Sequence, residues 1–204
     1  MNAHLYIEGG GNSKGEKSRC REAFKTLLQK QGFSGRLPRL TACGGRGSAY
    51  DDFKTAHATA QSGHFVGLLI DSEDPAAIPA DPLQQQTWEH LRRRDGWERP
   101  PGATDQQVLL MTTCMETWIA ADRATLRAHY GAGLNENQLP ATTNLESRHR
   151  HEVQEQLERA TAATSKPYRK GKRSFELLAK LNPEALDPLL PSFRRAIAIL
   201  EDKL

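Results

Sequence analysis

Two short acidic turns follow apolar runs in this chain, and their side chains have the chemistry of metal ligands. Glu8 ends the first run and precedes three glycines, whereas Asp71 and Glu73 follow a second run at residues 66–70. If both runs are parallel strands of one sheet, these carboxylates meet at its C-terminal edge, where open α/β folds place their sites. Carboxylate oxygens are preferred ligands of hard divalent cations. The sequence therefore predicts a Mg²⁺ or Mn²⁺ site.

Three further acids are candidates for a second ion, and each has an alternative. Asp74 precedes Pro75, so it can equally initiate a turn or cap a helix. Glu116 and Asp122 are six residues apart in one expected helix, about 240° around its axis, and cannot both face one site. Glu116 is nearer the strand end and is the preferred ligand. Asp122 can instead form an exposed ion pair with Arg123.

Hydrolysis of a phosphodiester also needs positive charge near the phosphate. Lys170 and Lys172 flank Gly171 late in the chain, and either can supply this charge. Ser174 can cap the following helix and also contact phosphate. The alternative for this segment is a basic surface loop.

Two other stretches are candidates for phosphate or nucleic-acid contact. The arginines at 92–94, of which we select Arg93 and Arg94, lie between Trp88 and Trp97, a combination suited to backbone contact and base stacking. The tryptophans can equally be core residues and the arginines a solvated face. Arg46 and Ser48 stand just before a helix, whose N-terminus can bind phosphate.

Alternating strands and helices must position these residues. We expect strands at residues 3–8, 39–43, 64–70 and 107–113, the third being the most apolar and therefore central. Helices are expected at 48–61 and 115–129, and another begins at an N-cap on Asn12 or Ser13 and ends near Gly32. The proline-rich segment 75–102 is expected to be a loop with a short helix. This alternation predicts an α/β fold with a parallel sheet flanked by helices.

The strand signals stop after Gly131, and helices are expected at 146–163, 174–181 and 191–204. We therefore divide the chain into an α/β catalytic core at 1–135 and a helical C-terminal extension at 136–204, which carries the basic Lys-Gly-Lys loop.

The composition excludes several classes of protein. The net charge of the 204 residues is only +3, so a polyanion must meet a local basic patch. The three cysteines form no Cys-x-x-Cys pair, and neighbouring His149 and His151 point in different directions on a helix, so no zinc site is indicated. No Gly-Lys-Ser/Thr follows the glycines, so ATP hydrolysis is not expected. Neither a signal peptide nor a membrane-spanning run is visible, and we expect a cytoplasmic protein that does not contact a membrane.

The order of the acidic motifs resembles that of the Toprim domain, the metal-binding fold of topoisomerases, bacterial primases and OLD-class nucleases. Glu8 with Gly9 is similar to its first motif, and Asp71, Glu73 and Asp74 are similar to its second. The resemblance implies a Toprim-like Rossmannoid sheet that holds Mg²⁺ or Mn²⁺. It also implies that Lys170 or Lys172 is the late lysine that contacts the scissile phosphate in OLD-like nucleases.

Residues 8 to 175 also resemble a bacterial Toprim-type family of unassigned function, generally encoded beside an AAA- or ABC-type ATPase in phage-defence loci. The shared motifs are Glu-Gly-Gly-Gly-x-Ser, Ala-Cys-Gly-x-Arg-x-x-Ala-Tyr-Asp-Asp-Phe, Leu-Leu-Ile-Asp-Ser-Glu-Asp, His-Leu-x-x-Arg-Asp-Gly-Trp, Met-Glu-x-Trp-x-x-Ala-Asp-Arg and Lys-Gly-x-x-Ser-Phe. This resemblance implies an effector subunit that acts with a separate ATPase partner.

Two functions from different classes are consistent with these observations. The first is a metal-dependent nuclease that cleaves DNA or RNA, tRNA included, as the effector of an ATPase-linked defence system. The second is a non-catalytic module of the same fold that binds a nucleotide, a phosphorylated ligand or a partner protein. A toxin of a toxin-antitoxin pair lies between the two. Basic patches contact the phosphate backbone and do not discriminate between sugars or bases, so the sequence does not identify the substrate.

Overall fold

A four-stranded parallel sheet forms the centre of the molecule in the computed structural model, which describes residues 3–204. The strands are β1 (Ala3–Glu8), β2 (Arg39–Gly44), β3 (Phe65–Asp71) and β4 (Val108–Met111), in the order β2-β1-β3-β4. All four expected strands are present, and the predicted α/β fold is confirmed. Because β3 lies between β1 and β4, all seven of its residues are buried, as its apolar sequence predicts.

Nine α-helices surround the sheet in the described part of the chain. They are α1 (Lys14–Leu28), α2 (Arg46–Ala58), α3 (Thr87–Asp95), α4 (Met115–Ala121), α5 (Arg123–Tyr130), α6 (Arg150–Thr161), α7 (Lys172–Leu178), α8 (Pro183–Leu186) and α9 (Pro191–Lys203). A π-helical turn, Gln29–Phe33, continues α1, and short 3-10 turns occur in the longer connections. Ser13 caps α1 by accepting a hydrogen bond from the Glu16 amide at 3.1 Å, as expected.

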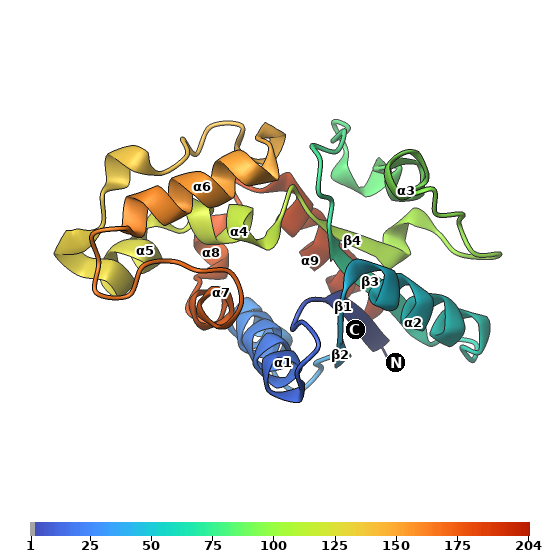
Figure 1. Cartoon of the computed structure of the whole chain (residues 1–204). Coiled ribbons are helices and arrows are strands. Elements are labelled where there is room, and N and C mark those ends of the chain that lie inside the picture. The colour runs from blue at the N-terminus through green and yellow to red at the C-terminus, as the bar shows by residue number, and fades with distance from the viewer. Residues whose placement is uncertain (1–2) are drawn as a thin grey trace.

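Alternation along the strands gives the sheet two apolar faces. Leu5 and Ile7 of β1 point to a core built with α1 and α9, whereas Leu68 and Ile70 of β3 point to a second core built with α2 and α3. Figure 1 shows α2 and α3 on one side of the sheet and α1 with α7 on the other. Burial of each such side chain stabilises the fold by roughly 1.5–3 kcal/mol.

The C-terminal helices contribute to the larger core. Helix α7 packs against α1, and α9 packs against β4. Phe175 of α7 and Phe193 of α9 are buried in the same apolar cluster as Phe24 of α1. The segment after residue 135 is therefore helical, as expected, and it covers the sheet and α1 directly (Figure 1).

The expected helix at 115–129 is wrong, because it breaks into α4 and α5 at Asp122. The backbone of Asp122 leaves the helical region, and its side chain accepts hydrogen bonds from the amides of Thr125 (2.9 Å) and Asn182 (2.8 Å). Asp122 is therefore a buried helix cap, and the alternative of an exposed ion pair with Arg123 is wrong as well.

Other boundaries shift by a few residues. Helix α2 begins at Arg46 and ends at Ala58, α7 begins at Lys172, and α6 begins at Arg150 after a 3-10 turn at Leu145–Ser147. Helix α8 was not expected from the sequence, although Asn182 and Pro183 supply its N-cap and first position. None of the helices within residues 3–204 has the length and apolar character needed to cross a lipid bilayer.

Candidate metal centre

The side chains of Glu8, Asp71 and Glu73 converge at the C-terminal edge of the sheet. One carboxylate oxygen of each lies within 4.8 Å of the other two. Glu8 and Asp71 end the adjacent parallel strands β1 and β3, and Glu73 follows two residues later. The convergence expected from the sequence is present. Three oxygens at this spacing fit the ligand set of a hard divalent cation.

The glycine turn after β1 positions Glu8. The pairing of β1 with β2 shifts register between Ile7 and Glu8, and such a bulge re-aims the side chain that follows it. Gly9 and Gly44 then exchange two backbone hydrogen bonds of 2.9 Å. Gly10 has a φ of +85°, and a Cβ there would lie 2.6 Å from the Cα of Lys17 in α1. The turn therefore requires glycine so that α1 can begin directly behind the site.

Asp71 is buried beneath the site and tied to α4. Its Oδ1 accepts a hydrogen bond of 2.8 Å from the Met115 amide at the first residue of that helix. Burial, followed by the charges of Glu8 and Glu116, raises the pKa of Asp71 well above its usual value. Three acids concentrated in a buried space are destabilising by themselves and attract positive charge.

Glu8 is held by a backbone amide and an arginine. Its Oε2 accepts hydrogen bonds from the Asp71 amide (3.2 Å) and from Nη1 of Arg46 (3.3 Å). Burial nevertheless raises the pKa of Glu8, against the opposing effect of Arg46. Arg46 also makes a two-point ion pair with Asp95 of α3, with Nε–Oδ1 at 3.0 Å and Nη2–Oδ2 at 2.7 Å. Arg46 thus links the acidic site to α3.

Glu73 has an unusual backbone and two arginine partners. Its φ of 69° lies in the left-handed region, which is uncommon outside glycine and clusters at functional sites. The Glu73 amide donates to the Thr113 carbonyl at 2.8 Å, which fixes the turn after β3 to the turn after β4. Its Oε2 accepts from Arg94 of α3 at 3.1 Å and pairs with Arg150 of α6. Two helices far apart in the sequence, α3 and α6, therefore meet at this carboxylate.

The remaining acidic candidates lie outside the group of three. Glu116 is 0% exposed and accepts hydrogen bonds from the Tyr168 hydroxyl (2.6 Å) and from Gln154 (3.2 Å). Its charge acts on Asp71 from behind the site. The Asp74 side chain is 60% exposed and pairs with Arg94 at 3.3 Å, so it faces solvent rather than the other carboxylates.

The structure separates the two candidate lysines. Desolvation acts to lower the pKa of Lys170, but the charges of Glu116 and Asp71 outweigh it and raise that pKa. Both lysines are exposed, and among the described residues no carboxylate lies within 4.0 Å of the Lys170 amine. The charges of Glu116 and Asp71 nevertheless act on Lys170, whereas Lys172 pairs loosely with Glu176 of its own helix, 3.8 Å away. Ser174 is buried, and its hydroxyl bonds to the backbone of Gly171, which closes the turn before α7.

The three arginines at the end of α3 have different partners. Arg92 and Arg93 are exposed and pair with Glu89, whereas Arg94 turns toward the acidic site. Trp88, on the inner face of α3, is buried in the core, and Trp97 is stacked on Tyr50 with ring centroids 4.2 Å apart. Both tryptophans therefore pack in or against the core, which is the alternative to base stacking that the sequence left open. Ser48 is exposed in the first turn of α2.

Four residues around the site were not identified from the sequence: Arg150, Asp95, Tyr168 and Gln154. Asp95 lies within the motif His-Leu-x-x-Arg-Asp-Gly-Trp, and Tyr168 lies two residues before Lys170. Proximity to these basic residues was the only signal in the sequence. Arg150 carried no such signal, because its pairing with Glu73 depends on the packing of α6 against α4. The complete site therefore combines three converging carboxylates, a nearby lysine amine and three arginines.

We compared the chain with known proteins. No curated protein matches it, and no solved structure matches it. A family model described as "Domain of unknown function (DUF4276)" matches residues 7–201, a span that includes both acidic turns, α3 and the Lys170 loop. The chain therefore belongs to the DUF4276 family.

Proposed function

We propose that this protein is a metal-dependent nuclease that hydrolyses phosphodiester bonds at the site formed by Glu8, Asp71 and Glu73. The observation that carries the proposal is the convergence of three carboxylate oxygens within 4.8 Å at the C-terminal edge of a parallel sheet. A divalent cation bound there supplies Lewis-acid activation of the phosphate and of the attacking water.

The surrounding residues have separate tasks in this proposal. Glu8, Asp71 and Glu73 hold Mg²⁺ or Mn²⁺, and the Lys170 amine neutralises charge that develops on the phosphate. Arg46 holds Glu8 in place through its ion pair with Asp95. Glu116, fixed by Tyr168, adds negative charge that favours binding of a cation. Asp74 and Lys172 are not required at the reacting centre.

The wider role rests on the family resemblance described for residues 8 to 175. We propose that the nuclease is the effector subunit of an anti-phage defence system and works with an AAA- or ABC-type ATPase encoded beside it. An effector of this kind is silent until triggered, so the isolated chain is expected to cleave weakly. The toxin of a toxin-antitoxin pair is the closest related role.

Cleavage assays test the proposal. Purified protein, alone and with the neighbouring ATPase, is incubated with plasmid DNA, single strands and tRNA in the presence of Mg²⁺, Mn²⁺ or a chelator. We expect metal-dependent cleavage that falls by at least about 10³-fold in a Glu8→Gln, Asp71→Asn double variant. A matched control, Asp51→Asn with Glu155→Gln, removes two exposed carboxylates from α2 and α6 and should retain activity.

Two results would contradict the assignment. Cleavage that survives the double substitution places the chemistry elsewhere. Absence of both metal binding and cleavage, with intact binding of a nucleotide or phosphorylated ligand, supports the non-catalytic module instead.

A further inference from the structure

A second site lies at the opposite edge of the sheet. An open groove of about 1210 Å³ runs over the amino-terminal ends of β1, β2 and β3, between the loop before β2 and the C-terminal half of α2. Acids of the metal centre end β1 and β3, whereas His4, Arg39 and His64 stand at or just before the beginnings of the three strands. None of the residues of the metal centre lines this groove.

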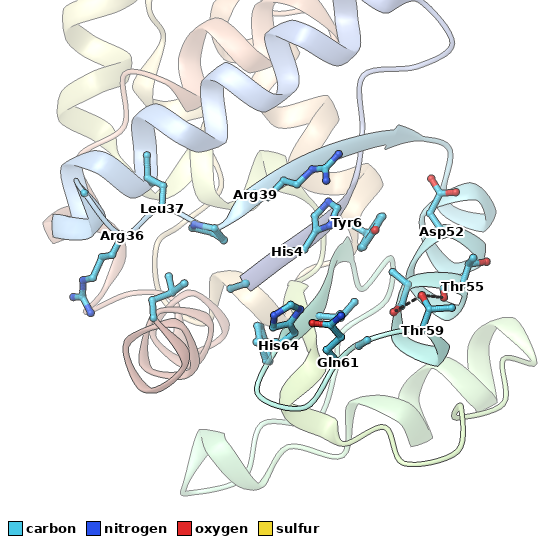
Figure 2. A pocket seen from close by; sticks show the side chains of 18 residues that line it. His4, Tyr6, Arg36, Leu37, Arg39, Asp52, Thr55, Thr59, Gln61 and His64 are labelled. Atoms are coloured by element: carbon cyan, nitrogen blue, oxygen red, sulfur yellow. Dashed lines mark hydrogen bonds between the residues drawn. The ribbon is translucent and has the colours of Figure 1, made fainter. Parts of the chain in front are cut away.

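The floor of the groove is a pair of stacked rings. His4 and Tyr6 alternate with buried residues on β1, so both face the α2 side of the sheet. Their ring centroids are 4.2 Å apart with planes inclined by 29°, and His4 is anchored by a hydrogen bond of 2.8 Å to Thr41 of β2. Figure 2 shows the two rings side by side between β2 and α2. Both are only half-buried, which leaves aromatic surface for a ligand ring.

The two walls of the groove differ in chemistry. Arg36 and Arg39, both exposed, supply positive charge on the side of β2 and its preceding loop. On the α2 side, the Thr55 hydroxyl donates to the Asp51 carbonyl at 3.0 Å, and the Thr59 hydroxyl donates to the Thr55 carbonyl at 3.1 Å. With their protons engaged in the helix, these oxygens act as acceptors toward a ligand. Asp52, the single acidic side chain among the described lining residues, is another acceptor (Figure 2).

We propose that this groove binds single-stranded RNA. Cations on one wall suit phosphates, the exposed rings suit an unpaired base, and a wall of acceptors suits the ribose 2′-hydroxyl, a donor that DNA lacks.

The size and the polar lining favour a polymer over a free nucleotide. Small-molecule sites typically measure about 300–1,000 Å³ and are mostly apolar and enclosed, whereas this groove is larger and polar. A paired duplex cannot offer a base to the rings. The groove also lies close to the metal centre along the same strand, since His4 and Glu8 are four positions apart on β1, roughly 13 Å. That one RNA strand reaches both places rests on the proposed function, but binding in the groove does not.

Fluorescence anisotropy with a labelled, unstructured RNA of about twelve nucleotides tests the proposal in the presence of EDTA, so that cleavage plays no part. Arg36→Gln with Arg39→Gln should reduce the slope of log affinity against log salt by about 1.4, because each lost phosphate contact on a single strand contributes about 0.7. Arg19→Gln with Arg21→Gln is the matched control, since it removes equal charge from exposed positions of α1. The control should bind within about twofold of the wild type at fixed salt.

Two further variants examine the rings and the acceptor wall. Tyr6→Leu should weaken RNA binding about tenfold through loss of stacking. Thr55→Val keeps the shape of an exposed helical side chain but removes the acceptor, so it should abolish the preference for RNA over DNA of the same sequence and leave DNA binding unchanged. Circular dichroism establishes that each variant is folded.

Four outcomes would overturn the proposal: no binding of RNA by the wild-type protein, equal binding of RNA and DNA, equal binding of an acidic peptide of similar charge, or groove variants that behave like the α1 control. Because all arms are measured without metal, failure of RNA binding leaves the nuclease proposal standing. Failure of cleavage likewise leaves the groove proposal standing.

Discussion

Glu146 gives a quantitative test of the electrostatics in this fold. It precedes α6, is buried, and accepts hydrogen bonds from the Ser192 amide at 3.1 and 3.2 Å and from the Ser192 hydroxyl. The carboxylate thus ties this loop to the first turn of α9. Burial raises its pKa from 4.5 to about 7, in spite of the Ser192 donors. Folding therefore favours the protonated form.

The sign of the pH dependence follows directly. A carboxyl group with a raised pKa in the folded state contributes its full stability below pH 4.5 and loses that contribution as the pH rises through about 7. The difference between the two pKa values corresponds to about 3 kcal/mol of unfolding free energy. The loss is about 1 kcal/mol near pH 5 and about 3 kcal/mol above pH 8.

The test is urea unfolding of the wild type and of Glu146→Gln near pH 5 and near pH 8.5. Glutamine keeps an acceptor for Ser192 but never ionises, so the variant should gain about 2.5 kcal/mol relative to the wild type across this range. A constant packing cost of the substitution does not affect this difference. Glu155→Gln, at an exposed position of α6, is the control and should show a change of about 0.5 kcal/mol or less at either pH. An equal stability difference at the two pH values would refute the reasoning.

Three further predictions concern the acidic site. Asp71→Asn should raise the unfolding free energy of the metal-free protein at neutral pH by about 0.5–2 kcal/mol in urea with EDTA, because a buried carboxylate with a raised pKa is removed; a loss of stability contradicts this. Lys170→Met should slow cleavage by about 100-fold and Lys172→Met by threefold or less, as measured by initial rates on one substrate; equal effects argue against the assignment of Lys170. Gly10→Ala should cost about 1–3 kcal/mol of stability, whereas Gly15→Ala, which has open space in α1, should gain about 0.5–1 kcal/mol, and both are measured by urea unfolding; a neutral Gly10→Ala disproves the tight turn.

The sheet and the convergence of its acids could be predicted because both depend on local pattern. Apolar runs set the strands, and the parallel arrangement brings the ends of β1 and β3 together, so Glu8 and Asp71 follow from the order of elements alone. The break at Asp122 could not be predicted in this way. Asp122 there caps α5 through the Thr125 amide and also accepts a hydrogen bond from the amide of Asn182, sixty residues later, which no helical period encodes.

The sequence also could not predict which of Lys170 and Lys172 interacts with the acidic site. Gly171 between them has a φ of +104°, and in the resulting turn the charges of Glu116 and Asp71 act on Lys170, whereas Lys172 begins α7 and lies 3.8 Å from Glu176. The same holds for Arg150, because its pairing with Glu73 depends on the packing of α6 against α4. Long-range packing, rather than local propensity, decides these contacts.

Isothermal titration of Mn²⁺ into the purified protein tests the central claim most directly. The account predicts saturable binding by the wild type and by the Asp51→Asn, Glu155→Gln control, and binding at least about 100-fold weaker in Glu8→Gln, Asp71→Asn. A folded Glu8→Gln, Asp71→Asn variant that binds Mn²⁺ as tightly as the wild type would show that the three converging carboxylates are not a metal centre.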